Sequence, residues 1–274
     1  MLAARNVAQA LGFGDANRPF LVGGGERDPG LDFLRAMAIV LVLIRHFLDR
    51  NKVYDPVIPQ SVVDFGLFGW AGVDLFFVLS GYLIFSGIFR LERDGAFSMF
   101  VFYKKGIYRI WPAYFASLAV CLALGIFAVA PADYVYFLFF LQNYAGPLSD
   151  LNGGIYWSLA VEEHFYIVAP LLLIAIVALK RHRLWLLLAL LAVPLVLRFA
   201  IYWLFVGSDM HAFYFQLYFP THARFDSLAA GVLCAYLVHS HRTLLHRPLV
   251  KVLLPPVCVV LMIGAYWSTA SLSL

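Results

Sequence analysis

The chain has 274 residues, of which 63% are hydrophobic and only 13% are charged. Soluble domains contain roughly 45–50% apolar and about 25% charged residues, so a soluble protein of this length could not bury this much apolar surface. The net charge of +4 is too small to indicate a nucleic-acid partner. The composition therefore predicts an all-α bundle of transmembrane helices whose partner is the lipid bilayer.

The first part of the chain lacks a long apolar stretch, and Gly23, Gly24 and Gly25 give it a flexible segment. We expect residues 1–30 to form a cytoplasmic tail and residues 31–274 to form one transmembrane domain. Seven segments are apolar enough to cross a bilayer, which takes about 20 residues. They are 31–48, 66–89, 111–130, 155–179, 184–205, 223–238 and 249–268. A shorter apolar stretch, 134–145, is expected to be re-entrant or interfacial.

Basic residues fall in alternate loops of this arrangement. Three loops carry them: Arg90, Arg93, Lys104, Lys105 and Arg109; Lys180, Arg181 and Arg183; and Arg242 and Arg247. The loops 131–154 and 206–222 contain no Lys or Arg. Because cytoplasmic loops are enriched in Lys and Arg, the pattern places the N-terminus in the cytoplasm. If 134–145 crossed the bilayer, the second basic loop would move to the outer side, so we interpret that stretch as non-spanning.

Arg35 and His46 are eleven residues apart in the first predicted helix. Eleven steps of about 100° bring them to within about 20° of one face, separated by a rise of about 16.5 Å. They cannot contact each other, but both could line one long channel. The alternative is that Arg35 extends to the inner interface and His46 caps the outer end of the helix.

Charged side chains inside a bilayer are costly and mark candidate functional groups. Asp74 lies between Gly72 and Gly81, in a segment whose small residues allow close helix contact, so we expect it to face protein and to pair with a cation or with His46. Glu162 and Glu163 open a long apolar helix and differ by about 100° in direction, so they cannot both face one site. The alternative for one of them is a stabilising acidic helix start.

Together, these motifs resemble the bacterial membrane-bound acyltransferase family 3, which includes O-acetyltransferases of envelope polysaccharides. The residues that carry the resemblance are Leu31–Ala36 with the Arg35-to-His46 spacing, Gly72–Ile84, Arg109–Pro112, Trp157–Tyr166, and Arg224–Asp226 with Gly231. They occur in the order typical of the family and cover roughly 31–240. The family fold is a ten-span bundle, so this chain, with about seven spans, is expected to lack C-terminal spans. The family also carries an Arg where this sequence has Gly106.

The resemblance implies acyl transfer from a cytoplasmic acyl-CoA, with acetyl-CoA as donor, to a hydroxyl of an extracytoplasmic or lipid-linked glycan. It implies no permanently bound cofactor and a location in the bacterial cytoplasmic membrane. The site residues that it implies fall into three groups. The donor contacts are Arg35, Lys104, Lys105 and Arg109; the catalytic group is His46, with Asp74, Glu162 or Glu163 to orient its imidazole; and the acceptor contacts are Trp157, Ser158, Arg224 and Asp226.

Two other classes of function stay open on the sequence alone. Buried carboxylates and His also serve as proton relays in transporters and channels, although the two halves of the chain show no inverted repeat. The chain could also be an inactive scaffold of an envelope-polysaccharide assembly. No metal site is expected, because His46, Asp74, Glu162 and His164 lack a tight ligand spacing. The sequence does not set the oligomeric state.

Overall fold

The computed structural model describes residues 28–51, 59, 63, 66, 68–126, 133–145, 156–179, 181–206 and 213–240. Its elements are all helical, which confirms the predicted all-α fold, and no strand occurs in these ranges. In chain order they are α2 (Pro29–Asn51), η1 (Phe68–Trp70), α4 (Ala71–Arg93), α5 (Met99–Ala123), α6 (Tyr134–Leu138), η3 (Gln142–Tyr144), α7 (Trp157–Ala178), α8 (Arg183–Ile201), η6 (Tyr202–Val206), η7 (Tyr214–Tyr218) and α10 (Thr221–Ser240).

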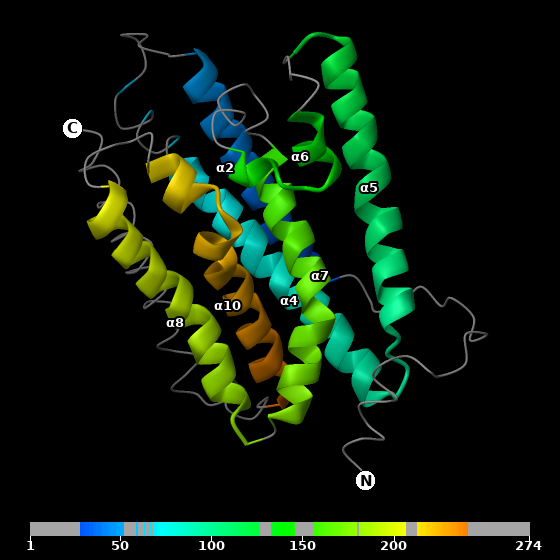
Figure 1. Ribbon diagram of the computed structural model, residues 1–274. Helices are drawn as coiled ribbons and strands as arrows, with labels where there is room; N and C mark the ends of the chain where they lie inside the picture. The colour runs from blue at the N-terminus through cyan, green and yellow to red at the C-terminus, as the bar shows by residue number, and fades with distance from the viewer. Residues whose placement is uncertain are drawn as a thin grey trace.

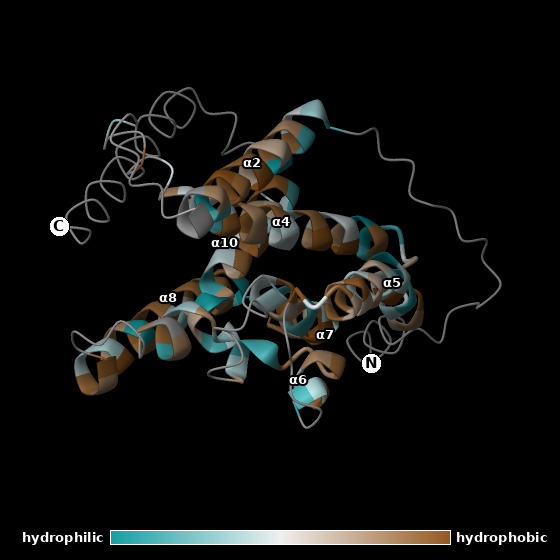
Figure 2. Ribbon diagram, turned by 90° about the horizontal axis from the view of Figure 1, so that it is seen from above, coloured by the Kyte–Doolittle hydropathy of each residue, from teal (hydrophilic) through white to brown (hydrophobic). Residues whose placement is uncertain are grey.

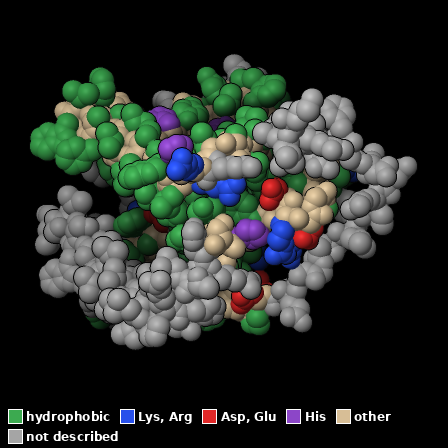
Figure 3. All heavy atoms as spheres, turned by 90° about the horizontal axis from the view of Figure 1, so that it is seen from below, with side chains coloured by type: hydrophobic (Ala, Val, Ile, Leu, Met, Phe, Trp, Pro, Cys, Tyr) green, Lys and Arg blue, Asp and Glu red, His purple; other side chains and the backbone are tan. Residues whose placement is uncertain are grey.

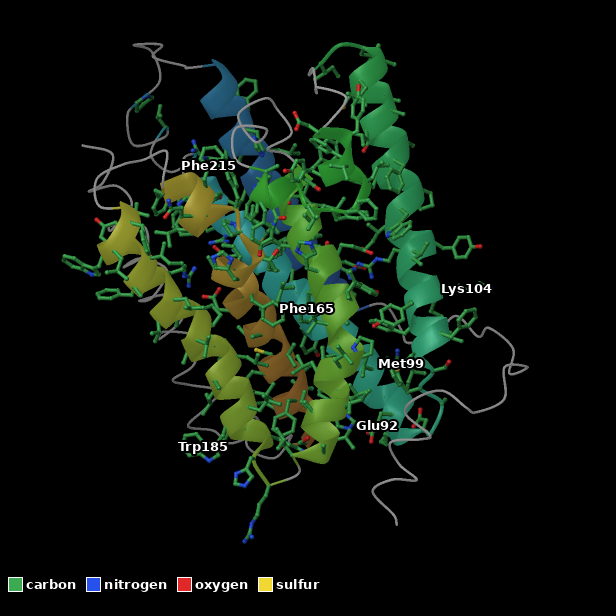
Figure 4. The ribbon with its side chains drawn as sticks, in the orientation of Figure 1. Glu92, Met99, Lys104, Phe165, Trp185 and Phe215 are labelled. Carbon is green, nitrogen blue, oxygen red and sulfur yellow. The ribbon has the colours of Figure 1, made fainter. Side chains whose placement is uncertain are left out.

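The long helices form one bundle in which α4, α7 and α10 are central and α2, α5 and α8 lie around them (Figures 1 and 2). In the most apolar part of α7, 61% of the residues are buried. The corresponding share is 22% in α5 and 11% in the stretch Arg183–Val206, which contains α8. The core joins the central helices through large side chains such as Phe77, Phe165 and Leu228. Figure 4 shows Phe165 in this interior. The outer helices expose apolar side chains, as expected where lipid is the solvent.

Within the described ranges, four helical stretches are long and apolar enough to cross a membrane: Phe68–Arg93, Met99–Ala123, Trp157–Ala178 and Arg183–Val206. The predicted spans 31–48 and 223–238 also form helices, α2 and α10. The predicted span 249–268 lies outside the described residues, as does most of the predicted tail. The protein is therefore a multi-pass membrane protein.

The third predicted span has the wrong boundaries. The sequence predicts a start at residue 111, but α5 begins at Met99. The predicted loop residues Lys104, Lys105 and Arg109 therefore lie within the helix. Ser98 starts the helix by accepting a hydrogen bond from the Val101 amide. The helix ends where Gly125 adopts a φ of +62°, which allows the Ile126 amide to bond to the Cys121 carbonyl.

The stretch 134–145 does not cross as one helix, which confirms the prediction. It forms the short helix α6, a turn and η3. The turn has Phe140 at a φ of +57°, which is unfavourable for a residue with a side chain. Its ring is stacked on Tyr114 of α5 with centroids 4.5 Å apart, and this packing holds the turn in place.

The basic residues that follow α4 and α7 lie at one end of the bundle. Arg90 and Arg93 end α4, and Arg181 and Arg183 stand where α7 gives way to α8, at the bottom of Figure 1. Seen from below, Lys, Arg and His side chains emerge there among hydrophobic ones (Figure 3). The placement of this end on the cytoplasmic side stays a prediction.

Helices α4 and α10 approach each other closely, and this contact depends on two glycines. A Cβ added to Gly81 would lie 2.2 Å from the Leu228 carbonyl oxygen, and one added to Gly231 would lie 2.1 Å from that of Val78. Contacts this short cannot exist, so only a residue without a side chain allows the two backbones to meet. The predicted role of the small residues in 69–81 is thereby confirmed.

We therefore expect Gly81→Ala to lower the free energy of unfolding by about 1–3 kcal/mol, because the added methyl group forces α4 and α10 apart. Gly87→Ala on the same helix is the matched control, since its Cβ would meet no atom within 4 Å. Thermal unfolding of both variants in detergent tests this expectation. Equal melting temperatures for the two variants would contradict it.

Candidate functional site

A pocket of about 440 Å³ lies between α2, α4 and α5. Its lining is Arg35, Phe76, Leu79, Ser80, Leu83, Ile84 and Arg109. The two arginines come from different helices, and the wall between them comes from α4. Two guanidinium groups beside an apolar wall suit a ligand with both an anionic and an apolar part. Both arginines belong to the set of donor contacts that the resemblance implies, and the structure brings these two together at one pocket.

Glu162 stands behind this pocket. Ser80 lines the pocket, and its hydroxyl donates a hydrogen bond to Glu162 Oε1 on α7. Only 4% of the Glu162 surface is exposed. The positive charges of Arg109 and Arg35 both act on this carboxylate. Ser80 therefore stands between the Glu162 carboxyl group and the pocket space.

Glu163 turns toward α5 and away from Glu162, and the predicted divergence of the two side chains is confirmed. Its Oε1 accepts a hydrogen bond of 2.9 Å from Trp111 Nε1. Its Oε2 is buried and has no hydrogen-bond partner among the described residues. The two adjacent side chains therefore form hydrogen bonds with different helices, Glu162 with α4 and Glu163 with α5. Glu163 is not part of the pocket lining.

Asp74 faces protein, and its partner is a cation. Arg224 Nη2 lies 3.0 Å from Asp74 Oδ1, and the Ser227 hydroxyl donates to the same oxygen at 2.6 Å. Of the two partners predicted for Asp74, the structure shows the cation. This polar cluster joins α4 to α10.

Arg224 also packs against aromatic rings. Its guanidinium carbon lies 5.6 Å from the centroid of Trp157 and 5.0 Å from that of Tyr218. Among the predicted acceptor contacts, Arg224 and Trp157 are thus together. Asp226 turns to α8 and pairs with Arg198, and Ser158 is half-buried on α7.

A polar cluster that the sequence reasoning missed links η3, α7 and α10. Thr221 Oγ1 accepts from Asn143 Nδ2 at 2.8 Å and lies 2.6 Å from His164 Nδ1. Gln142 donates to the Tyr156 carbonyl at 3.0 Å. The sequence does carry a sign of this cluster: the apolar stretch 134–145 contains two adjacent amides, Gln142 and Asn143. Buried amide groups need hydrogen-bond partners, so such a pair indicates a polar contact with another element.

Three other predicted site residues lie away from the pocket. His46 is exposed on α2, and it does not line the pocket that contains Arg35. The predicted channel joining the two residues is therefore not part of this cavity. Lys104 is exposed on the side of α5 that faces away from α7 (Figure 4). Lys105 lies one turn before Arg109 and is half-buried.

Comparison with known proteins finds a family model described as an acyltransferase domain, which matches residues 28–273. A Staphylococcus aureus protein provisionally named an O-acetyltransferase is 28% identical over 225 residues, which are 76% of this chain and 34% of that protein. The peptidoglycan O-acetyltransferase OatA of Listeria monocytogenes is 29% identical over 173 residues, covering 53% of this chain and 24% of that protein.

A third relative, the O-acetyltransferase OatA of Staphylococcus aureus, is 31% identical over 166 residues, again covering 53% of this chain and 24% of the relative. The matched region thus spans about a third or less of each of these relatives. No solved structure matches.

The Asp74–Arg224 pair generates a stability prediction. We expect Asp74→Asn to lower the free energy of unfolding by about 2–3 kcal/mol, because Arg224 would keep a buried charge without its counter-ion. The matched control is Asp94→Asn, which removes the exposed pair with Arg93 and should change stability by less than about 0.5 kcal/mol. Denaturation in detergent measures the free energy of unfolding of both variants. Equal losses of stability would show that the Asp74–Arg224 pair contributes no more than the exposed Arg93–Asp94 pair.

Proposed function

Since the chain belongs to this acyltransferase-domain family, we propose that it is a membrane O-acyltransferase that moves an acetyl group from cytoplasmic acetyl-CoA to a hydroxyl of an extracytoplasmic or lipid-linked glycan. The observation that supports this proposal most directly is the pocket with Arg35 and Arg109. The names of the relatives support O-acetylation of an envelope glycan as the reaction class. Family membership also favours acyl transfer over solute transport.

The pocket chemistry suits the donor. Coenzyme A carries phosphate groups on a nucleotide and a thin, largely uncharged arm that ends in the thioester. Guanidinium groups bind phosphate through paired, charge-assisted hydrogen bonds. Arg35 and Arg109 would hold the phosphates, and the arm would lie against Leu79, Leu83 and Ile84. Lys105, on the same face of α5 as Arg109, would add a further positive charge.

The predicted general base is His46. It would take the proton from the acceptor hydroxyl as the oxygen attacks the thioester carbonyl. The carbon–sulfur bond then breaks, and the CoA thiolate leaves without needing a strong acid. Arg35 lies about 16.5 Å along α2 from His46, so it belongs to donor binding and not to the reacting carbonyl.

The three carboxylates predicted to orient the imidazole have other described partners. Glu162 bonds to Ser80, Glu163 bonds to Trp111, and Asp74 bonds to Ser227 and pairs with Arg224. Glu162 would support the donor site by holding Ser80, which lines the pocket between the two arginines. Asp74 supports the acceptor side by holding Arg224 beside Trp157. An aromatic ring beside a charged hydrogen-bonding group is a surface suited to a sugar.

We expect Arg35→Ala and Arg109→Ala each to raise the Kd for acetyl-CoA by about 10- to 100-fold, the loss that follows removal of a charge-assisted hydrogen bond. The control is Arg93→Ala, which removes an exposed arginine outside the pocket. Equilibrium binding of acetyl-CoA to protein in lipid nanodiscs gives the measurement. Unchanged affinity in both pocket variants would rule out this donor site.

His46→Ala should leave the Kd for acetyl-CoA unchanged and slow the release of CoA thiol by about 10²- to 10⁴-fold, since it removes only the base. Thiol release is followed in nanodiscs with acetyl-CoA and glycan fragments as acceptors. Equal rates in the wild type and the variant would remove His46 from the chemistry. Solute flux in proteoliposomes without any acyl donor would support the transporter class.

A further inference from the structure

Helix α5 lies at the edge of the bundle, so its rotation about its own axis decides where Arg109 points (Figure 1). Its buried stripe runs through Gly106, Ile110, Tyr114 and Leu118. Arg109 and Trp111 flank Ile110, each about 100° from it in opposite directions. A rotation that moves Trp111 away from α7 would therefore move Arg109 as well. The contacts of Trp111, together with the hydrogen bonds of Tyr103, Tyr114 and Ser117 to other elements, therefore bear on the direction of Arg109.

Two contacts outside α5 hold Trp111. Its Nε1 donates to Glu163 Oε1 at 2.9 Å. Its ring lies 5.8 Å from that of Phe140, measured between centroids. The hydrogen bond to Glu163 is the only one of these contacts with a fixed direction, because ring packing tolerates sliding and a hydrogen bond does not.

The contact between α5 and α7 also has a pivot. A Cβ on Gly106 would lie 2.8 Å from the Tyr166 ring, so the two helices approach closely there. Gly106 lies on the buried stripe and offers no side chain that could resist rotation. Tyr103, on nearly the same line, donates to the Ile167 carbonyl at 2.9 Å. Contacts along this line fix the separation of the helices, whereas the Trp111–Glu163 bond, to one side of it, fixes the rotation.

We propose that Glu163 is a positioning residue: by accepting the Trp111 indole N–H, it fixes the rotation of α5 and so holds Arg109 in the pocket. This inference rests on the proposed donor-binding function of that pocket. It assigns Glu163 a role different from that of the adjacent Glu162, which bonds to Ser80 in the pocket wall. It also differs from the predicted catalytic role of Glu163.

The two roles require different properties of the side chain. A catalytic carboxylate needs its charge or its proton, but a positioning residue needs only an oxygen that accepts one hydrogen bond. Gln supplies that oxygen at almost the same place and carries no charge. Glu163→Gln should therefore keep the affinity for acetyl-CoA, and Glu163→Ala should lose it.

The experiment is a mutant cycle on acetyl-CoA binding to the full chain in nanodiscs. We expect Glu163→Ala and Trp111→Phe to raise the Kd about tenfold and Glu163→Gln to leave it within about twofold. Combining Glu163→Ala with Arg109→Ala should add nothing to Arg109→Ala alone, because both remove the same contact. Tyr103→Phe is the matched control: it removes an α5–α7 hydrogen bond of equal length and leaves the Trp111–Glu163 bond in place.

A second measurement needs no donor. Spin labels replacing Leu83 and Arg109, which line the pocket from α4 and α5, should change separation in the Glu163→Ala background and not in the Glu163→Gln background. These labels require variants in which the native cysteines are replaced. If the wild type does not bind acetyl-CoA, the proposed function fails while this test of the rotation still stands.

Two results would overturn the inference. One is a loss of affinity in Glu163→Gln as large as that in Glu163→Ala, which would show that the charge matters. The other is an unchanged label separation in Glu163→Ala. In either case Arg109 could still bind the donor, so the result would leave the proposed function intact.

Discussion

Water is absent from the hydrocarbon region of a membrane, so each polar side chain inside the bundle needs a partner on another helix. Several of the described polar groups meet this requirement in pairs that join neighbouring helices. Ser80 joins α4 to α7 through Glu162, and Trp111 joins α5 to α7 through Glu163. Asp74 joins α4 to α10 through Arg224. These pairs determine which faces of the helices meet, because apolar side chains are equally well solvated by lipid and by each other.

The pairs act together with the close packing of the central helices. Gly81 and Gly231 let α4 and α10 touch backbone to backbone, which brings Asp74 within reach of Arg224. The peripheral helices have less contact with the core, so a single hydrogen bond contributes more to fixing their orientation. This is most pronounced for α5, which carries Arg109 into the pocket and meets α7 mainly along the line through Gly106. The rigid centre therefore supports a site whose charged edge depends on an outer helix.

This division separates the two sides of the proposed reaction. The pocket with Arg35 and Arg109 gathers cationic groups for the donor. Arg224, between Trp157 and Tyr218, gathers rings and a guanidinium for the acceptor. The two adjacent glutamates at the start of α7 contact the helices that line the donor pocket, Glu162 through α4 and Glu163 through α5. A short acidic motif thus organises a site to which it contributes no lining atom.

The sequence by itself determined the fold class, most of the helices and the motifs that carry the family. Apolar length and helical periodicity are local properties, and they are sufficient for such conclusions. It also predicted that Asp74 faces protein and that Glu162 and Glu163 diverge, because these follow from helix geometry. It misplaced the start of α5, because basic side chains with long stems lie within a membrane helix and resemble a loop by charge alone.

Only the tertiary structure decided which partners meet. Helix rotation and pairing depend on contacts between residues far apart in the chain, such as Asp74 with Arg224 and Asn143 with Thr221. A single sequence does not record these contacts. The spacing of Arg35 and His46 placed them on one face of a helix, but a pocket forms between helices, and this one contains Arg35 without His46. Local pattern determines the helices, and the packing of their polar and small residues determines the site.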